Sequence, residues 1–91
     1  MSIFFSGFFY IFSLLKMLMD NKKVKAIGKR IREIRLIDLE MNQADFAKVV
    51  GTGQARISLI DKGLVLPTME VFCNIVNLAK KRTADWIIKG K

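Results

Sequence analysis

Apolar residues recur every three or four positions along most of the chain, and this is the period of an amphipathic α-helix. The first stripe of this kind consists of Val24, Ile27, Ile31 and Ile34. It predicts a helix from about residue 24 to residue 37, which follows a polar hinge at residues 20–24. The opposite side of this helix carries Lys25, Lys29 and Arg32. Together with four shorter helices further along, the pattern predicts an all-α domain of five helices.

The segment 42–63 is predicted to form two short helices joined by a tight turn. Asn42 is a favourable N-cap for the first of them. The inward face of this first helix is expected to contain Phe46, Ala47 and Val50. Residues 51–53, Gly-Thr-Gly, break the helix, and a second one runs from about 54 to 62, with Gly63 at its C′ position. Two helices across a three-residue turn that contains Gly match the pattern of a DNA-binding helix-turn-helix.

The second helix of this segment has two chemically different faces. At 100° per residue, one face contains Ile57, Ile60 and Asp61. The other face contains Ala55, Leu59 and Lys62, flanked by Gln54, Arg56 and Ser58. A helix this short is not stable alone in water, so its apolar face must pack on a scaffold. Its opposite face is then free to enter a groove.

Two further helices complete the predicted domain. Thr68 is the expected N-cap of the fourth helix, and Glu70 suits the positive end of its dipole. The inward stripe of this helix is expected to contain Met69, Phe72, Cys73, Val76 and Ala79. After a basic run at residues 80–82, Thr83 is expected to cap a last short helix that Gly90 ends. The core anchors of this last helix are expected to be Trp86 and Ile87.

Residues 1–19 form an apolar, Phe-rich extension that differs from the predicted domain at residues 20–91. They hold five of the seven Phe residues, and Lys16 is their only charge. They lack a basic start and a small-residue cleavage site, which argues against a cleaved signal peptide. The uncharged run at 1–15 is shorter than the ~20 residues that a spanning helix needs. Three interpretations stay open: an upstream extension with a later methionine as the working start, an extra helix packed on the domain or across a dimer, and a membrane anchor.

Composition narrows the possible partners and chemistries. A formal net charge of +8 and a pI near 10.0 favour a polyanion, either nucleic acid or an anionic membrane face. The single Cys73 cannot form an internal disulfide, fits a cytoplasmic protein and is expected to fill the core. The chain has no His, which excludes a Cys/His zinc site and a His-based triad. With no phosphate-binding Gly-rich loop and no obvious carboxylate pair, we expect no catalysis, metal or cofactor.

Four segments stand in an order and spacing that a known family shares: residues 27–35 (IGKRIREIR), 42–47 (NQADFA), 57–63 (ISLIDKG) followed by Pro67, and 83–90 (TADWIIKG). On these segments the chain resembles the lambda-repressor-like (Cro/repressor type) helix-turn-helix domain family. Four pieces in order are more specific than a lone helix-turn-helix pattern. The resemblance implies a compact five-helix domain that binds double-stranded DNA as a transcriptional repressor or regulator. A phage-type repressor, an antitoxin and a restriction-modification controller all share this fold.

The resemblance puts the helix at 54–62 in the DNA major groove, with its N-terminal half toward the bases. Gln54 could pair with adenine through its amide, the alternative being a solvated residue at the start of the helix. Ala55 and Leu59 could contact a thymine methyl group, form a groove-facing surface that only tolerates DNA, or pack against another element. Arg56 could reach guanine or phosphate, and phosphate is the more general partner of the two.

Further residues are expected to contact the DNA backbone or to hold the helices in place. Ser58 would either bond a phosphate or, being small, permit close approach. By resemblance Gln43 clamps a phosphate together with the positive end of its helix. Lys62 would meet a backbone phosphate or only complement the helix dipole. Arg35 and Asp61 would form the family's internal Arg–carboxylate pair, with Asp in place of the usual Glu.

The remaining expectations concern partners and departures from the family. A homodimer on a palindromic site is expected, with half-sites about 34 Å apart. Gly53 replaces the usual Ser or Thr at the N-cap of the recognition helix. The apolar loop at 64–66 replaces a polar one and suggests a partner surface, either a dimer contact or a dock for residues 1–19. A protein partner such as a toxin is a further possibility. The basic run at 80–82 stands where a Gly and an apolar residue are usual. An alternative function is a protein-interaction or membrane-tethered module that uses residues 1–19 and this loop.

Overall fold

The computed structural model describes residues 20–91, and in this range the chain is helical with no β-strand. The elements are α2 (Asn21–Glu33), the π-helical turn η1 (Ile34–Asp38), α3 (Gln43–Val50), α4 (Gln54–Asp61), α5 (Met69–Leu78) and α6 (Ala84–Lys89). The predicted all-α, five-helix class is therefore confirmed for this range. The three interpretations of residues 1–19 lie outside the described residues. Between residues 20 and 91, no helix has both the length and the apolar content needed to cross a membrane.

Helix α2 begins three residues earlier than the hydrophobic pattern predicts. The side chain of Asp20 accepts hydrogen bonds from the backbone N–H groups of Lys22, at 3.0 Å, and Lys23, at 3.4 Å. These bonds satisfy two of the amide groups that every helix leaves free at its start. The prediction of a polar hinge at 20–24 is therefore wrong. Asp20 caps the helix, and its polar neighbours form the first exposed turn.

The C-terminal end of the first predicted helix is not an α-helix. From Ile34 to Asp38 the backbone widens into a π-helical turn, in which the N–H of Leu39 bonds to the carbonyl of Ile34 at 2.9 Å. Ile34 and Arg35 face the interior, whereas Leu36 and Ile37 are 46% and 64% exposed. The widened turn thus buries a charged residue beside the apolar stripe. π turns within helices are frequent at functional sites, so the surroundings of Arg35 are of interest for function.

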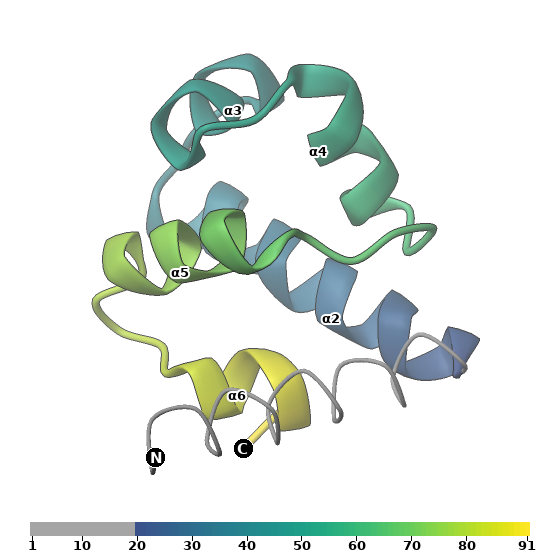
Figure 1. Ribbon diagram of the computed structural model, residues 1–91. Helices are drawn as coiled ribbons and strands as arrows, with labels where there is room; N and C mark the ends of the chain where they lie inside the picture. Colours follow the sequence, from purple (N-terminus) through teal and green to yellow (C-terminus); the bar gives the residue numbers. More distant parts are fainter. Residues whose placement is uncertain (1–19) are drawn as a thin grey trace, which may run out of the picture.

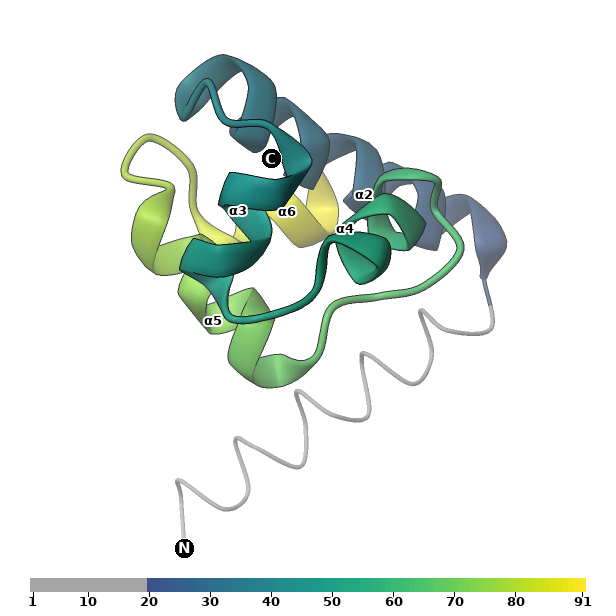
Figure 2. The same cartoon turned by 90° about the horizontal axis from the view of Figure 1, so that it is seen from above.

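The core lies where all the described helices meet. Helices α3 and α4 stand on one side of α2 and α5, and α6 lies on the other side (Figures 1 and 2). The predicted stripe of α2 is buried, and so are the predicted inward residues of α3. Phe46, Ile57, Ile60, Ile75 and Ile87 are each 0% exposed. Because four different helices contribute these side chains, none of the short helices depends on its own stability.

The inward face of α5 matches the predicted stripe only in part. Phe72 and Ala79 are buried and Val76 packs against the core, as predicted. The buried residues within α5 are Val71, Phe72 and Ile75, while Met69 is 40% exposed and Cys73 is exposed. The prediction that Cys73 fills the core is therefore wrong. Apolar residues occupy most positions of this helix, so periodicity alone cannot choose its face. Packing places Val71, Phe72 and Ile75 inward and leaves Cys73 on the surface.

Helix α4 lies so close to α2 that one position admits no side chain. A Cβ atom at Gly28 would collide with the backbone carbonyl oxygen of Ile60. Nearby, Gly63 has a φ of 73° and packs against the backbone of Lys25. This is the positive-φ C′ residue that the sequence predicts after the second motif helix. The two glycines fix the distance and the exit path of α4.

Candidate nucleic-acid interface

Two short helices and the turn between them form the candidate interface. Asn42 caps α3, with its Oδ1 accepting from the N–H of Asp45 at 2.8 Å. Gly51 ends α3 in the left-handed conformation, with a φ of 82°. From α5, Asn74 donates its Nδ2 to the carbonyl of Val50 at 3.0 Å, which anchors the start of the turn. Residues 51–53 then separate the two helices, as predicted.

Helix α4 separates an inner supporting face from an outer free face. Ile57 and Ile60 on the inner face are 0% exposed, and Asp61 is largely buried beside them. The outer residues Gln54, Ala55, Arg56 and Lys62 are exposed. Leu59 is 38% exposed, and Ser58 is half-buried at the edge. The predicted division of this helix into two faces is therefore confirmed.

The free face of α4 offers amide, guanidinium, hydroxyl and ammonium groups around a small apolar centre. Gln54 and Arg56 stand at its N-terminal end, Lys62 follows its C-terminal end, and Ala55 and Leu59 lie between them. Leu59 is only partly covered, so a ligand on this face can contact its side chain. Gly53 makes no side-chain cap, so the first amides of α4 have no side-chain partner at that position. A polyanion approaching this face would meet both cations and free N–H groups.

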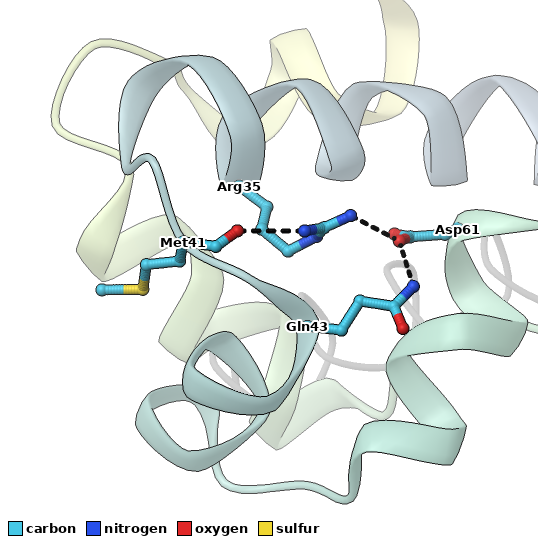
Figure 3. A network of polar contacts seen from close by, with 4 residues as sticks. All are labelled: Arg35, Met41, Gln43 and Asp61. Carbon is cyan, nitrogen blue, oxygen red and sulfur yellow. Dashed lines mark hydrogen bonds and ion pairs between the residues drawn. The ribbon is translucent and has the colours of Figure 1, made fainter.

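A buried polar network ties α4 to the rest of the scaffold (Figure 3). Arg35 donates its Nη2 to Asp61 Oδ2 at 3.0 Å, which is the ion pair that the resemblance implies. Its Nη1 donates to the carbonyl of Met41 at 2.9 Å. Gln43 donates its Nε2 to the same Asp61 oxygen at 3.0 Å. The Asp61 carboxylate thus joins the end of α4 to η1 and to the start of α3, and Arg35 adds the connection before α3 through Met41.

This network leaves two polar atoms without partners. Among the described residues, Arg35 Nε and Asp61 Oδ1 are buried and have no hydrogen-bond partner. The short Asp side chain presents one oxygen to the guanidinium instead of the paired contact that two oxygens can make. The shared oxygen Oδ2 is reached from both sides, by Arg35 and by Gln43. The Arg35–Asp61 pair is thus present, but its hydrogen bonding is incomplete.

A polar cleft of about 280 Å³ lies over this network. Its lining consists of Arg32, Arg35, Gln43, Ser58, Asp61 and Lys62. The structure therefore brings together three residues predicted to contact DNA: Gln43, Ser58 and Lys62. It also adds Arg32, which sequence reasoning placed only on the outer side of its helix. The signal for Arg32 was available, because it lies three residues before Arg35 and so on a neighbouring helical face.

Gln43 has a different first partner from the one expected. Its Nε2 turns toward Asp61 instead of pointing freely to solvent at the start of α3. A primary amide carries two N–H donors, so one remains for a phosphate in the cleft. The positive end of α3 and Gln43 still lie together, which is the arrangement that an anion site requires.

The basic run at 80–82 contains a structural residue that the sequence did not reveal. Arg82 donates its Nε to Asp38 at 3.0 Å and stacks its guanidinium 4.2 Å from the centre of the Trp86 ring. The hydrogen bond to Asp38 raises the pKa of Arg82 above its ordinary value. Lys80 and Lys81 remain exposed. Arg82 thus connects η1 to α6, whereas Lys80 and Lys81 lie on the solvated surface.

The apolar loop at 64–66 is less exposed than its sequence suggests. Leu64 is 63% exposed, but Val65 and Leu66 are half-buried and pack against the core. Only one large side chain of this loop is therefore presented to a partner. Among the described residues, no group of His, Cys, Asp or Glu could hold a metal ion.

Comparisons with known proteins found no relative of this chain. No family model, curated protein or solved structure matches the chain. The case for its function therefore depends on the geometry of the described residues and on the sequence pattern.

Proposed function

We propose that this chain binds double-stranded DNA as a helix-turn-helix protein and acts as a transcriptional repressor or regulator. The observation that carries the proposal is the division of α4, whose inner Ile57 and Ile60 are fully buried while its outer polar face is exposed. A helix held in this way can enter a major groove without losing its packing. The net charge of +8 supports the same partner.

The outer residues divide by the part of DNA that each would meet. Gln54, at the N-terminal end of α4, would read a base edge, and an adenine suits its amide. Ala55 and Leu59 would contact thymine methyl groups. Arg56 would bind a backbone phosphate, as would the cleft that contains Lys62.

The cleft gives the backbone contact a defined place. Gln43 and Ser58 supply neutral hydrogen-bond donors there, and Arg32 and Lys62 supply positive charge. The buried Asp61 orients Gln43 and Arg35 from below, so its role is positioning. Phosphate contacts of this kind set the register of a protein on the duplex, and base contacts then specify the sequence.

One recognition helix covers only a few base pairs, so we propose that the functional unit is a homodimer on a palindromic site. Its two copies of α4 would stand about 34 Å apart, one turn of B-DNA. The length of duplex protected from nuclease by the bound protein measures this arrangement. Protection of a single half-site would contradict it.

The test of DNA binding begins with selection of duplexes from a random pool by the full-length chain. The enriched duplex and a scrambled one are then titrated at low and at moderate salt. Retention of the enriched duplex in added salt, with loss of the scrambled one, is the expected result. Equal and salt-sensitive binding of both would reduce the protein to a basic domain on a polyanion and contradict the proposal.

Gln54→Ala and Lys62→Ala separate base reading from phosphate binding. Gln54→Ala is expected to weaken the enriched duplex by ~1–3 kcal/mol and to leave the scrambled duplex unchanged, because one bidentate base contact is lost. Lys62→Ala is expected to weaken both duplexes alike and to lower the salt slope by about one unit. Lys89→Ala is the matched control, since it removes the same charge from α6 on the other side of α2. If Gln54→Ala left specificity intact, α4 would not be the reading helix.

A further inference from the structure

A second feature of the surface lies on the α6 side of α2, and it shares only Arg32 with the cleft of the interface just described. It is a groove of about 700 Å³ between α2, η1 and α6. At one end Leu36, Ile37 and Trp86 line it, and Leu36 and Ile37 are 46% and 64% exposed. The π turn directs these two apolar side chains outward, although buried residues precede them. Adjacent large apolar side chains at a concave surface indicate a binding site.

The groove continues to the start of α2. A second hollow of about 460 Å³ is lined by Lys22, Lys23, Ala26, Arg30, Ile88 and Lys89. The two hollows share Ala26 and Arg30, so they form one track along α2 and η1. Arg30 is fixed there, because its Nη1 donates to the carbonyls of Ile87 at 3.0 Å and Ile88 at 3.1 Å. The track is cationic near Lys22. Toward Ile37 its apolar side chains Leu36, Ile37 and Trp86 are bordered by charged ones: Lys29, Arg32 and Glu33.

The occupant of this track should be apolar at one end and reach the start of α2 at the other. Residues 1–19 meet both conditions, because they join the domain at Asp20, beside Lys22 and Lys23. Their first fifteen residues carry no charge, and Lys16 is their only charged side chain. A second copy of the domain suits the track less well, since it would bring two cationic rims together.

The lengths of the two segments also agree. Nineteen residues in a helix would span about 28 Å, and the eighteen residues from 21 to 38 span about 27 Å at the same rise. We propose that residues 1–19 fold back at Asp20 and lie along the track antiparallel to α2. In this register Ile3, Phe4 and Phe5 reach the apolar end at Leu36 and Ile37. Lys16 then stays at the charged end, close to Asp20.

Cross-linking in the full-length chain tests this register directly. The one native thiol is first removed by Cys73→Ser, which changes an exposed residue. Ile37→Cys is then combined in separate proteins with Ile3→Cys, Phe4→Cys or Phe5→Cys, and with Lys16→Cys as the matched control. Under mild oxidation at high dilution, at least one of the first three pairs is expected to close an intramolecular disulfide severalfold faster than the control. A disulfide forms only when the two Cα atoms approach within about 4.4–6.8 Å.

Two results would overturn the proposal. Equal, slow closure of all four pairs would show that residues 1–19 do not lie in the track. Closure between chains, at a rate that falls with dilution, would assign the track to the extension of a second copy.

Fluorescence of Trp86, the single tryptophan, gives an independent measurement without a new cysteine. Ile37→Asp places a charge at the apolar end of the track and is expected to raise quenching of Trp86 by acrylamide severalfold. Because Ile37 is exposed to solvent in the described domain, the fold of residues 20–91 should stay intact. Lys81→Asp changes an exposed residue outside the track and is the matched control. Unchanged quenching in Ile37→Asp would contradict the proposal. If the emission of Trp86 increased only when anionic vesicles were added, this would also contradict the proposal, because it would assign the track to a lipid surface.

Discussion

Two arginine–aspartate pairs of the same length lie in different surroundings in this molecule. Arg35 Nη2 and Arg82 Nε each lie 3.0 Å from an Oδ2 atom, of Asp61 and Asp38 respectively. The side chains of the first pair are 6% and 8% exposed, whereas in the second pair Arg82 is 27% and Asp38 is 10% exposed. Because the distances are equal, burial is what distinguishes the two pairs. Removal of the carboxylate leaves a buried guanidinium in the first pair and a partly hydrated one in the second.

The two pairs also join different parts of the fold. The Arg35–Asp61 pair connects η1 to the end of α4 and includes Gln43, so it positions the candidate interface. The Arg82–Asp38 pair connects η1 to the segment before α6 and adds a stacking contact with Trp86. The first should therefore affect both stability and DNA binding, and the second should affect stability alone.

The largest expected effect is that of Asp61→Ala. It leaves the buried Arg35 guanidinium without its carboxylate, and we expect a loss of ~3–5 kcal/mol in the free energy of unfolding. Urea denaturation followed by circular dichroism measures this loss. Asp38→Ala is the matched control from the more exposed pair, and its loss should be clearly smaller. Equal losses in the two variants would contradict the distinction by burial.

A double substitution sharpens this test. Arg35→Met with Asp61→Leu removes both charges and keeps apolar volume, so stability should return close to that of the unchanged protein. Binding of the enriched duplex should stay weakened, because Gln43 and the cleft lose their orienting carboxylate. Full recovery of binding together with stability would show that the pair contributes nothing to the interface.

Asp61→Glu is expected to change stability by less and in the opposite direction. The longer side chain can bring a second oxygen to Arg35, whose Nε now lacks a partner. Satisfying such a buried donor should raise the free energy of unfolding by about 1 kcal/mol. The same urea titration measures the gain. A loss instead would show that the space at the end of α4 is too small for one more methylene group.

Arg82→Ala should have the smallest effect of these substitutions. Water reaches its guanidinium, so the ion pair with Asp38 is partly screened and the contact with Trp86 provides much of what is lost. Thermal unfolding at low and high salt measures both parts, and the difference from the unchanged protein should shrink as salt is added. Lys81→Ala, which removes a solvated charge one residue earlier, is the control. If the difference in thermal stability did not depend on salt, the ion pair would contribute nothing and the stacking contact with Trp86 would account for the whole loss.

The buried face of a helix could be predicted from the sequence only where polar residues alternate with apolar ones. In α2, α3 and α4, polar residues interrupt the apolar ones often enough that only one face can be buried, and those faces were predicted correctly. In α5 apolar residues stand on nearly every side, so the burial of Ile75 and the exposure of Cys73 depended on packing with other helices. The start of α2 was not predicted, because a polar segment that contains Asp20 also fits a hinge. Only the hydrogen bonds that Asp20 accepts from Lys22 and Lys23 identify it as the N-cap.

The candidate interface shows the same division. The outer face of α4 and the Arg35–Asp61 pair follow from residue type and spacing together with the family resemblance. The bond from Gln43 to Asp61 does not, because it needs two helix ends to meet. The π turn that buries Arg35 and exposes Ile37 is likewise absent from any 3.6-residue pattern. The hydrogen bond between residues five apart that defines this turn is seen only in the backbone structure.

The contact between Gly28 and the carbonyl of Ile60 has a consequence for the energetics of binding. Main-chain atoms have no rotamers, so the spacing between α2 and α4 does not change when nearby side chains rearrange. A surface held in this way loses little conformational freedom when a ligand docks on it. More of the contact energy at the outer face of α4 is then available as affinity, because the cost of ordering that helix has already been met in folding.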